Sequence, residues 1–402
     1  MSQLLRDKSI LFGVSGGIAA YKAVSWVREL VREGARVTVV MTGAATRFVT
    51  PLTFAALSGN RVHTDMFDED GAETIPHIAL GRDRDLVVVA PATARTMARL
   101  AHGLADDLLS TAVMAAAGPV ILCPAMNSRM YEHPATRANL AALRGYGYTV
   151  VEPGCGALAC GDEGPGRLAE WDTAREAMLA ALSPRDLTGR TVLVTAGPTR
   201  EPLDPVRHLS NRSSGRMGFW LARTAARRGA RVILVTGPVA LPDPPGIETV
   251  RVESGEEMHR AVLARLNEVS VVVKAAAVSD YRPKETASHK LKKGAGSMEL
   301  GLTMNPDILK ELGEMKRGGR CLFLAGFAAE SRDHLAEGRR KLGDKNLDLL
   351  AVNDIGGPET GFAVETNRVT LLDREGGEME LPLLSKEETA ERIWDRIVKL
   401  LE

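Results

Sequence analysis

Apolar residues gather in short runs that alternate with longer segments of mixed polarity. The first run, residues 9–14, is apolar after Ser9; a helical pattern over 18–33 and a second apolar run over 35–41 follow it. A run without polar alternation is typical of a strand buried on both faces of a sheet. A strand–helix–strand unit therefore opens the chain. The same order returns after the midpoint, at 191–195, 218–228 and 229–237.

Further apolar runs predict more strands, and helical patterns separate most of them. These runs are 85–90, 120–123, 271–276, 321–325 and 347–352. Because the strand–helix–strand unit occurs twice, two sheets that each begin with one such unit fit the pattern better than one continuous sheet. Residues 171–182 predict a closing helix and 183–189 have the composition of a linker, so we place a boundary near 187. The prediction is an α/β protein with two doubly wound, mainly parallel-sheet domains, 1–187 and 188–402.

Composition narrows the class of protein. The chain has 402 residues, 45% of them apolar, and 51 basic side chains balance 51 acidic ones. This balance argues against nucleic acid or a membrane as a partner. No apolar run reaches the roughly 18 residues of a membrane span, and the charged N-terminal segment does not resemble a secretion signal, so we expect a cytoplasmic protein. The cysteines form no C-x-x-C pair, which argues against structural zinc.

Suitable binding residues lie at three predicted strand ends, where ligands of such sheets bind. Ser15-Gly16-Gly17 stands between a strand and a helix, where bare backbone N–H groups attract phosphate. Its spacing is not the dinucleotide fingerprint, which favours a mononucleotide, although glycines also occur in such turns for geometry alone. Thr93 and Asn127 follow the other two strands and bring a hydroxyl and a carboxamide to the same edge.

The first half resembles flavin-dependent cysteine decarboxylases, and most closely the phosphopantothenoylcysteine decarboxylases of coenzyme A synthesis. The resemblance rests on Gly-Val-Ser-Gly-Gly-Ile-Ala-Ala-Tyr-Lys (13–22), His77-Ile-Ala-Leu, Ala-Pro-Ala-Thr (90–93) and Pro-Ala-Met-Asn-Ser-Arg-Met (124–130). It implies a flavodoxin-like domain that binds FMN. The implied contacts are Ser15, Gly16, Gly17, Thr42, Pro91, Ala92 and Thr93. Two positions depart from the family pattern, with Arg95 in place of asparagine and Tyr131 in place of tryptophan.

The resemblance also implies catalytic roles. Loss of carbon dioxide from a cysteine carboxyl needs an electron sink, which oxidation of the thiol-bearing carbon by FMN creates. His77 would assist either that oxidation or the charge of the flavin, Asn127 would hold the carboxylate, and Cys160, on a glycine-rich flap, would donate the returning proton. Judged without the resemblance, His77 also fits a surface or capping histidine. Cys155 and Cys160 then fit inert thiols or a facultative disulfide.

An unusually long connection, 195–218, joins the first strand and helix of the second half. It combines prolines with Arg207 and Asn211, and Ser213 or Ser214 is placed to cap the helix. Connections of this length are generally functional or disordered. The connection resembles the phosphopantothenate–cysteine ligases that are often fused to the decarboxylase, and this implies a Rossmann-like domain. Further matching segments are 275–283, 290–293, 305–309 and 326–330.

The ligase reaction needs a leaving group on a carboxyl, which a nucleoside triphosphate supplies as an acyl-nucleotidyl anhydride, with Mg²⁺ as template. The resemblance implies CTP as the nucleotide, Lys290 as the group that promotes acyl-cytidylate formation and Asn211 as its binding residue. Asp280 would hold the metal. The other implied contacts are Arg207, Ala275, Ala276, Pro306, Asp307, Ile308, Leu309, Phe327, Lys341 and Lys345.

Ordinary structural roles stand beside these assignments. Lys290 and Lys292 alternate, which predicts one face of a short strand, and without the resemblance a solvated strand edge is the ordinary explanation of such lysines. Phe327 also fits core packing. Arg216 stands where the ligase family has lysine, and Lys274, before an alanine run, has no place in the pattern.

The two motif sets together predict a bifunctional enzyme of coenzyme A biosynthesis. It would couple 4′-phosphopantothenate to cysteine and then decarboxylate the product to 4′-phosphopantetheine. One alternative is a ligase whose flavin half is only a scaffold, and another is a flavin-binding regulatory subunit. The resemblance further implies trimeric decarboxylase contacts and dimeric ligase contacts, and hence a homo-dodecamer.

Overall fold

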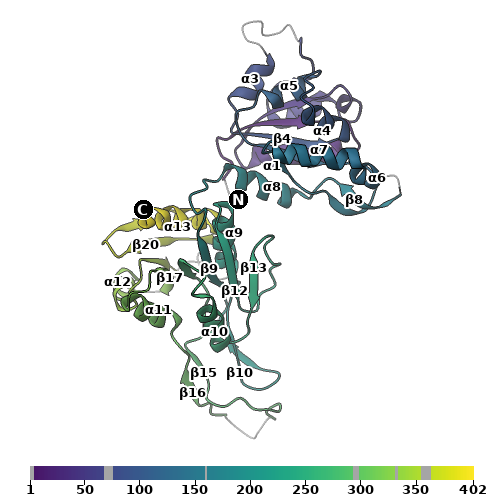
Figure 1. Cartoon of the computed structure of the whole chain (residues 1–402). Helices are drawn as coiled ribbons and strands as arrows, with labels where there is room; N and C mark the ends of the chain where they lie inside the picture. Colours follow the sequence, from purple (N-terminus) through teal and green to yellow (C-terminus); the bar gives the residue numbers. More distant parts are fainter. Residues whose placement is uncertain (1–3, 68–75, 159–160, 293–297, 331–333, 355–363) are drawn as a thin grey trace. The chain divides into compact units, whose positions relative to one another are not determined.

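The computed structural model of the chain describes residues 4–67, 76–158, 161–292, 298–330, 334–354 and 364–402. The chain divides into two compact units, the first ending at Ser183 and the second beginning at Pro184. Each unit has its own sheet with helices packed against it (Figure 1). The predicted fold class, α/β with mainly parallel sheets, is therefore confirmed.

The sheet of the first unit is parallel throughout its described strands. In sheet order its strands are β3 (Val62–His63), β2 (Arg36–Met41), β1 (Ser9–Val14), β4 (Leu86–Ala92), β5 (Val120–Pro124) and β6 (Thr149–Val150). The order reverses between β1 and β4, so the loops that follow these two strands separate and leave a crevice at their carboxyl ends.

Alternating side chains of these strands build two cores, one on each face of the sheet. Ile10 and Phe12 pack beneath α1 (Ala20–Arg32), α2 (Pro51–Ser58) and α8 (Trp171–Leu182). Leu11 and Val87 pack beneath α4 (Ala94–Ala101), α5 (Leu108–Met114) and α7 (Pro134–Gly145). The remaining elements are the short helices η1 (Ala45–Arg47), α3 (Pro76–Arg82) and α6 (Ser128–Glu132) and the hairpin of β7 (Gly154–Ala157) with β8 (Glu163–Arg167).

Six neighbouring strands of the second unit's sheet are parallel, and the two strands at one edge are antiparallel. In sheet order the strands are β13 (Glu248–Arg251), β12 (Arg231–Thr236), β9 (Thr191–Ala196), β14 (Val271–Lys274), β17 (Phe323–Glu330), β18 (Leu349–Asp354), β20 (Val369–Asp373) and β21 (Glu378–Glu380). The order reverses between β9 and β14, which again opens a crevice at the carboxyl ends.

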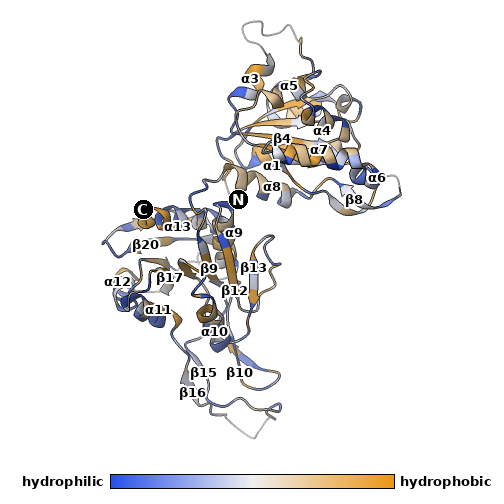
Figure 2. Cartoon of the chain, viewed as in Figure 1, coloured by the Kyte–Doolittle hydropathy of each residue, from blue (hydrophilic) through white to orange (hydrophobic). Residues whose placement is uncertain are grey.

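The second sheet is also covered on both faces. One face packs on α9 (Arg216–Arg227) and α13 (Lys386–Leu401), and the other on α10 (Gly255–Arg265), α11 (Ile308–Arg317) and α12 (His334–Asp344). The central strands of both sheets are largely orange in Figure 2, in keeping with burial on two faces. Short antiparallel pairs complete the unit: β10 (Arg200–Pro202) with β11 (His208–Ser210), β15 (Tyr281–Pro283) with β16 (Leu302–Met304), and β19 (Thr366–Asn367) with β22 (Leu384–Ser385).

Two local predictions were wrong. Residues 290–292 form no strand, because the backbone of Leu291 bonds to side chains of another loop rather than to a strand. Neither Ser213 nor Ser214 is the N-cap of α9, since that position belongs to Gly215, whose φ of 76° is left-handed.

Candidate functional sites

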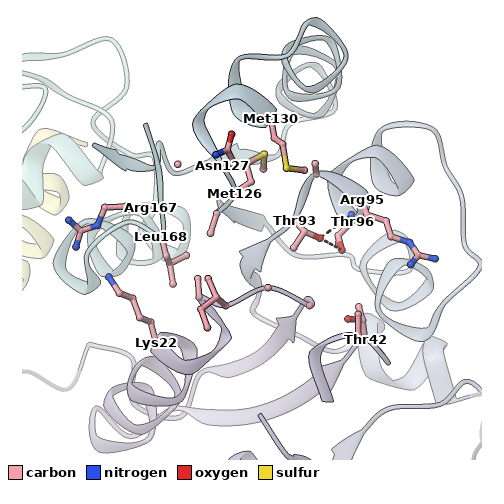
Figure 3. A pocket seen from close by; sticks show the side chains of 18 of the residues that line it. Lys22, Thr42, Thr93, Arg95, Thr96, Met126, Asn127, Met130, Arg167 and Leu168 are labelled. Carbon is pink, nitrogen blue, oxygen red and sulfur yellow. Dashed lines mark hydrogen bonds between the residues drawn. The ribbon is translucent and has the colours of Figure 1, made fainter. Parts of the chain in front are cut away.

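A pocket of about 1020 Å³ lies at the carboxyl ends of the strands of the first unit (Figure 3). Its wall is formed by the loops after β1, β2, β4 and β5 and by the β7–β8 hairpin. Helices α1 and α4 both begin at this wall, so both direct the positive ends of their dipoles toward it. Of the seven predicted flavin contacts, the wall contains Gly16, Gly17, Thr42 and Thr93.

The other three predicted contacts lie behind this wall. The hydroxyl of Ser15 is buried, donates to the carbonyl of Pro91 at 2.6 Å and accepts the backbone N–H of Thr93 at 2.9 Å. Ala92 is fully buried in the core. Ser15 therefore joins the loops after β1 and β4, and through Thr93 it fixes the start of α4.

The loop after β1 presents unused hydrogen-bond donors. Among the described residues, the backbone N–H groups of Gly16, Gly17, Ile18 and Ala19 have no acceptor, although all four residues line the pocket. The loop also runs close to the one after β2: a Cβ at Gly16 would lie 2.4 Å from the Cβ of Ala44. Four free donors at a helix start form a cradle for a phosphate group.

Asn127 connects the end of β5 to the β7–β8 hairpin. Its side-chain oxygen accepts the N–H of Arg129 at 2.9 Å and so caps α6, while its amide group donates to the carboxylate of Asp162 at 2.7 Å. Nearby, the N–H of Met126 donates to the carbonyl of Gly166 at 2.9 Å. The carboxamide is thus held between the end of β5 and the β7–β8 hairpin. Figure 3 shows Asn127 beside Met126 at the pocket.

The structure describes little of the two other predicted catalytic residues of this half. Cys160 lies outside the described residues, and of His77 only the backbone, in α3, is described. Cys155, on β7 of the same flap, is an exposed free thiol.

The two departures from the family pattern differ in position. Arg95 is exposed and lines the pocket, and in Figure 3 its side chain extends away from Met126 and Asn127. Tyr131 is not in the wall; its hydroxyl donates to Glu152 at 2.5 Å. Burial, with the hydrogen bond to this carboxylate, raises the pKa of Tyr131 to about 12. Tyr131 therefore has a packing role here.

Two cations of the pocket were missed by the sequence reasoning. Lys22 on α1 and Arg167 on β8 both line it, and Figure 3 shows them on the same side. The ammonium group of Lys22 lies 3.9 Å from Glu170, and the guanidinium of Arg167 has no hydrogen bond or ion pair with another described residue. Lysine and arginine on helices and hairpins are usually solvated, so nothing in the sequence distinguishes these two.

In the second unit, the predicted residues around the β9–β14 crevice come together. The amide of Asn211 donates to the carbonyl of Ala277 at 2.9 Å, and the N–H of Ala276 donates to the hydroxyl of Thr195 at 3.2 Å. The N–H of Asn305 donates to the carbonyl of Asp280 at 2.8 Å. The long loop after β9, the loop after β14 and the segment before α11 therefore form one surface.

Asp307 and Lys345 form an ion pair on this surface. The carboxylate of Asp307 caps α11 by accepting the N–H of Lys310 at 3.1 Å and lies 2.8 Å from the ammonium group of Lys345. Burial opposes the charge of Asp307, but hydrogen bonds from Lys345 and the Lys310 backbone still lower its pKa. Ile308 and Leu309 are buried in the core, so only their backbone is available to a ligand.

Arg207 is occupied by other parts of its own unit. Its guanidinium donates to the carboxylate of Asp204 at 3.0 and 2.6 Å and to the carbonyl of Leu291 at 3.0 Å. These bonds hold the pKa of Asp204 well below its usual range. Since Lys290 is exposed and adjacent to Leu291, the contact also positions the lysine segment beside the long loop.

The remaining predicted contacts are placed more loosely. Phe327 is half-buried against the core, and Lys341 lies on α12. Arg216, at the family's lysine position, pairs with Glu365. Among the described residues no group of three or more His, Cys, Asp or Glu side chains is arranged to hold a metal ion. Any metal at Asp280 would therefore take most of its ligands from elsewhere.

Comparison with known proteins covers both units. The flavoprotein family model matches residues 1–183, and the model of the DNA/pantothenate metabolism flavoprotein C-terminal domain matches residues 187–401. The coenzyme A biosynthesis bifunctional protein CoaBC of Bacillus subtilis (strain 168) is 46% identical over 401 residues, which are 99% of this chain and 98% of that protein. The chain belongs to the family of bifunctional coenzyme A biosynthesis proteins.

Membership confirms the predicted enzyme class, a phosphopantothenoylcysteine decarboxylase combined with a phosphopantothenate–cysteine ligase, the first of them a flavoprotein. Two solved structures each match one half. The C-terminal domain of a CoaBC protein is 42% identical, covers 54% of this chain and 98% of that structure, and has a TM-score of 0.47. The FMN-dependent cysteine decarboxylase SpaF is 34% identical, covers 45% of this chain and 99% of that structure, and has a TM-score of 0.39. No described helix is long and apolar enough to cross a membrane.

Proposed function

We propose that the pocket of the first unit binds FMN and 4′-phosphopantothenoylcysteine, and that the β9–β14 crevice of the second unit binds CTP, 4′-phosphopantothenate and cysteine. The observation that carries the first assignment is the set of four free N–H donors at 16–19, in a loop that leaves no room for a side chain at Gly16. These features fit the phosphate of a mononucleotide.

When bound, FMN supplies the two-electron oxidation of the thiol-bearing carbon and the later return of a hydride. The protein residues then have separate tasks. Asn127, fixed between β5 and the flap, holds the substrate carboxylate until carbon dioxide leaves. Cys160 donates a proton to the resulting ene-thiol, and His77 assists the initial loss of the thiol proton.

The phosphate end of the substrate is proposed to lie against Lys22 and Arg167. Both line the pocket on one side, and the guanidinium of Arg167 has no partner among the described residues. Lys22→Met and Arg167→Met should therefore raise the KM for phosphopantothenoylcysteine but not for pantothenoylcysteine, with FMN content unchanged. Equal effects on both substrates would refute this placement.

For the ligase we propose that Lys290 neutralises charge as the acyl-cytidylate forms and that Asn211 binds this intermediate while the amine of cysteine attacks. Asp280 would hold Mg²⁺, which proteins usually bind through one or two carboxylates while phosphate oxygens and water complete the coordination. The support is the convergence of the loops carrying Asn211, Asp280 and Asp307 on one surface.

Assembly of several copies is part of the proposal. Ile18, Tyr21 and Met130 border the flavin pocket and are 62%, 61% and 51% exposed. Such an apolar rim supports trimer contacts around the pocket, and dimer contacts of the second unit would then give a dodecamer. Light scattering should show twelve copies, and Tyr21→Asp should lower both the mass and the FMN content. A monomer would refute the assembly.

One reaction mixture tests both activities. Purified protein with 4′-phosphopantothenate, cysteine, Mg²⁺ and CTP should yield 4′-phosphopantetheine by mass spectrometry. Accumulation of 4′-phosphopantothenoylcysteine would instead support a scaffold role for the flavin half, and unchanged substrate would refute the ligase sites. Cys160→Ser should stop after carbon dioxide release, whereas Cys155→Ser, on the same flap, should turn over normally.

A further inference from the structure

We propose that Lys274 is a substrate-binding residue of the ligase site and that its ammonium group binds the phosphate chain of the nucleotide. The inference rests on the proposed function of the second unit and adds a residue to it. Lys274 is the last residue of β14, one of the two strands between which the sheet order reverses. It lies opposite Thr195 of β9 and Gly326 of β17 in the parallel register.

Strand alternation places its side chain. Val271 and Val273 pack in the core beneath α9 and α13, whereas Val272 packs in the opposite core, beneath α10 and α11. Lys274 therefore belongs to the face of Val272. On that face, at the carboxyl end of β14, stands the start of α11 with its cap Asp307.

Among the described residues, no carboxylate lies close enough to Lys274 to form an ion pair with it. Its neighbours in electrostatic range are Lys345, Asp307 and Asp280. The carboxylate of Asp307 already caps α11 and pairs with Lys345 at 2.8 Å. The ammonium group of Lys274 makes no hydrogen bond or ion pair with another described residue. Burial, followed by repulsion from Lys345, lowers the pKa of Lys274 to about 8.

A partly buried lysine without a partner is unfavourable unless a ligand completes its environment. The ligand is expected to be an anion. The ammonium groups of Lys274 and Lys345 and the positive end of α11 lie at this place, and the carboxylate of Asp307 is already bonded to Lys345. A triphosphate supplies several oxygens to such a group, and nucleotide binding at the point of strand reversal is the general behaviour of these sheets. The carboxylate of 4′-phosphopantothenate is the other anion in the reaction, and the test separates the two.

The test compares Lys274→Met, which keeps the apolar stem, with Lys274→Arg, which keeps the charge. We expect Lys274→Met to raise the KM for CTP about tenfold or more, because it removes one charge-assisted hydrogen bond to the nucleotide. The KM values for cysteine and 4′-phosphopantothenate should stay within about twofold, and Lys274→Arg should recover part of the loss. Lys310→Met is the matched control, since Lys310 is exposed on α11 next to the same cap.

The outcomes are distinct. An unchanged KM for CTP overturns the inference, and a rise confined to 4′-phosphopantothenate assigns the lysine to that substrate instead. An equal loss for all three substrates shows a structural role and also overturns it. The decarboxylase rate of the same preparations reports whether the chain has folded, and isothermal titration with CTP replaces KM if turnover is too slow. Absence of CTP-dependent pyrophosphate release in the unsubstituted protein would refute the proposed ligase function itself.

Discussion

Replacing Gly16 by alanine should weaken FMN binding without affecting ligation. The backbone at Gly16 is not left-handed, so only space restricts this position. An alanine Cβ would lie 2.4 Å from the Cβ and 2.7 Å from the carbonyl carbon of Ala44, where ordinary contact begins near 3.4 Å. The loop after β1 must therefore move by about 1 Å, and the backbone of Ala44 cannot rotate out of the way.

Overpacking of this kind costs about 1–3 kcal/mol. Because the displaced loop carries the four free N–H donors, we expect the cost to appear in the affinity for the flavin. Since 1.4 kcal/mol is tenfold in a dissociation constant, FMN should bind about 5- to 150-fold more weakly. The assay is titration of the flavin-free protein with FMN, followed by flavin fluorescence, with CTP-dependent ligation measured on the same samples.

Gly43→Ala provides the matched control. Gly43 lines the same pocket, its backbone is also not left-handed, and a Cβ there meets nothing within 4 Å. FMN affinity of Gly16→Ala within twofold of the unsubstituted protein would refute the reasoning. An equal loss in Gly43→Ala would also refute it, because the cause would then be a methyl group in the pocket rather than the approach of two backbone segments.

Three further predictions concern other parts of the chain. Arg227→Met should lower the free energy of unfolding of the second unit by about 3–5 kcal/mol, because it removes the guanidinium that lies 2.8 Å from the buried carboxylate of Glu387. Thermal denaturation measures this loss, and the double variant with Glu387→Leu should recover part of the lost stability. Iodoacetamide at pH 8 should label Cys155 but not Cys123, since burial raises the pKa of the Cys123 thiol to about 12 and keeps it protonated. Asn211→Asp should abolish ligation and spare decarboxylation of added phosphopantothenoylcysteine, because a carboxylate cannot donate to Ala277.

Each of these three has an outcome that contradicts it. If Arg227→Met denatured at the same temperature as the unsubstituted protein, the ion pair between Arg227 and Glu387 would be solvated in solution. Labelling of Cys123 as fast as Cys155 would show that β5 opens readily. Normal ligation by Asn211→Asp would remove Asn211 from the list of catalytic residues, and loss of both activities would indicate misfolding instead.

The strands and helices were predictable from sequence because burial on two faces leaves continuous apolar runs that few other structures produce. The closing helix, for example, was predicted at 171–182 and is α8, Trp171–Leu182. Prediction failed where a backbone group bonds to a distant side chain. The segment at Leu291 is fixed by Asp204 and Arg207, 84 and more residues earlier in the chain, and no local pattern reveals such a partner.

The fold class, the strand ends that carry the sites and, through the motifs, the family could all be predicted from the sequence. Which residues share a surface, and which are already bonded to other residues, became clear from the folded chain. It showed that Ser15 braces the pocket from behind, that Arg207 is bonded to Asp204, and that Lys274 lies beside the Asp307–Lys345 pair without a partner. The physical reason is that hydrogen bonds and charge interactions depend on distances between segments remote in sequence, whereas apolar periodicity is a local property of the chain.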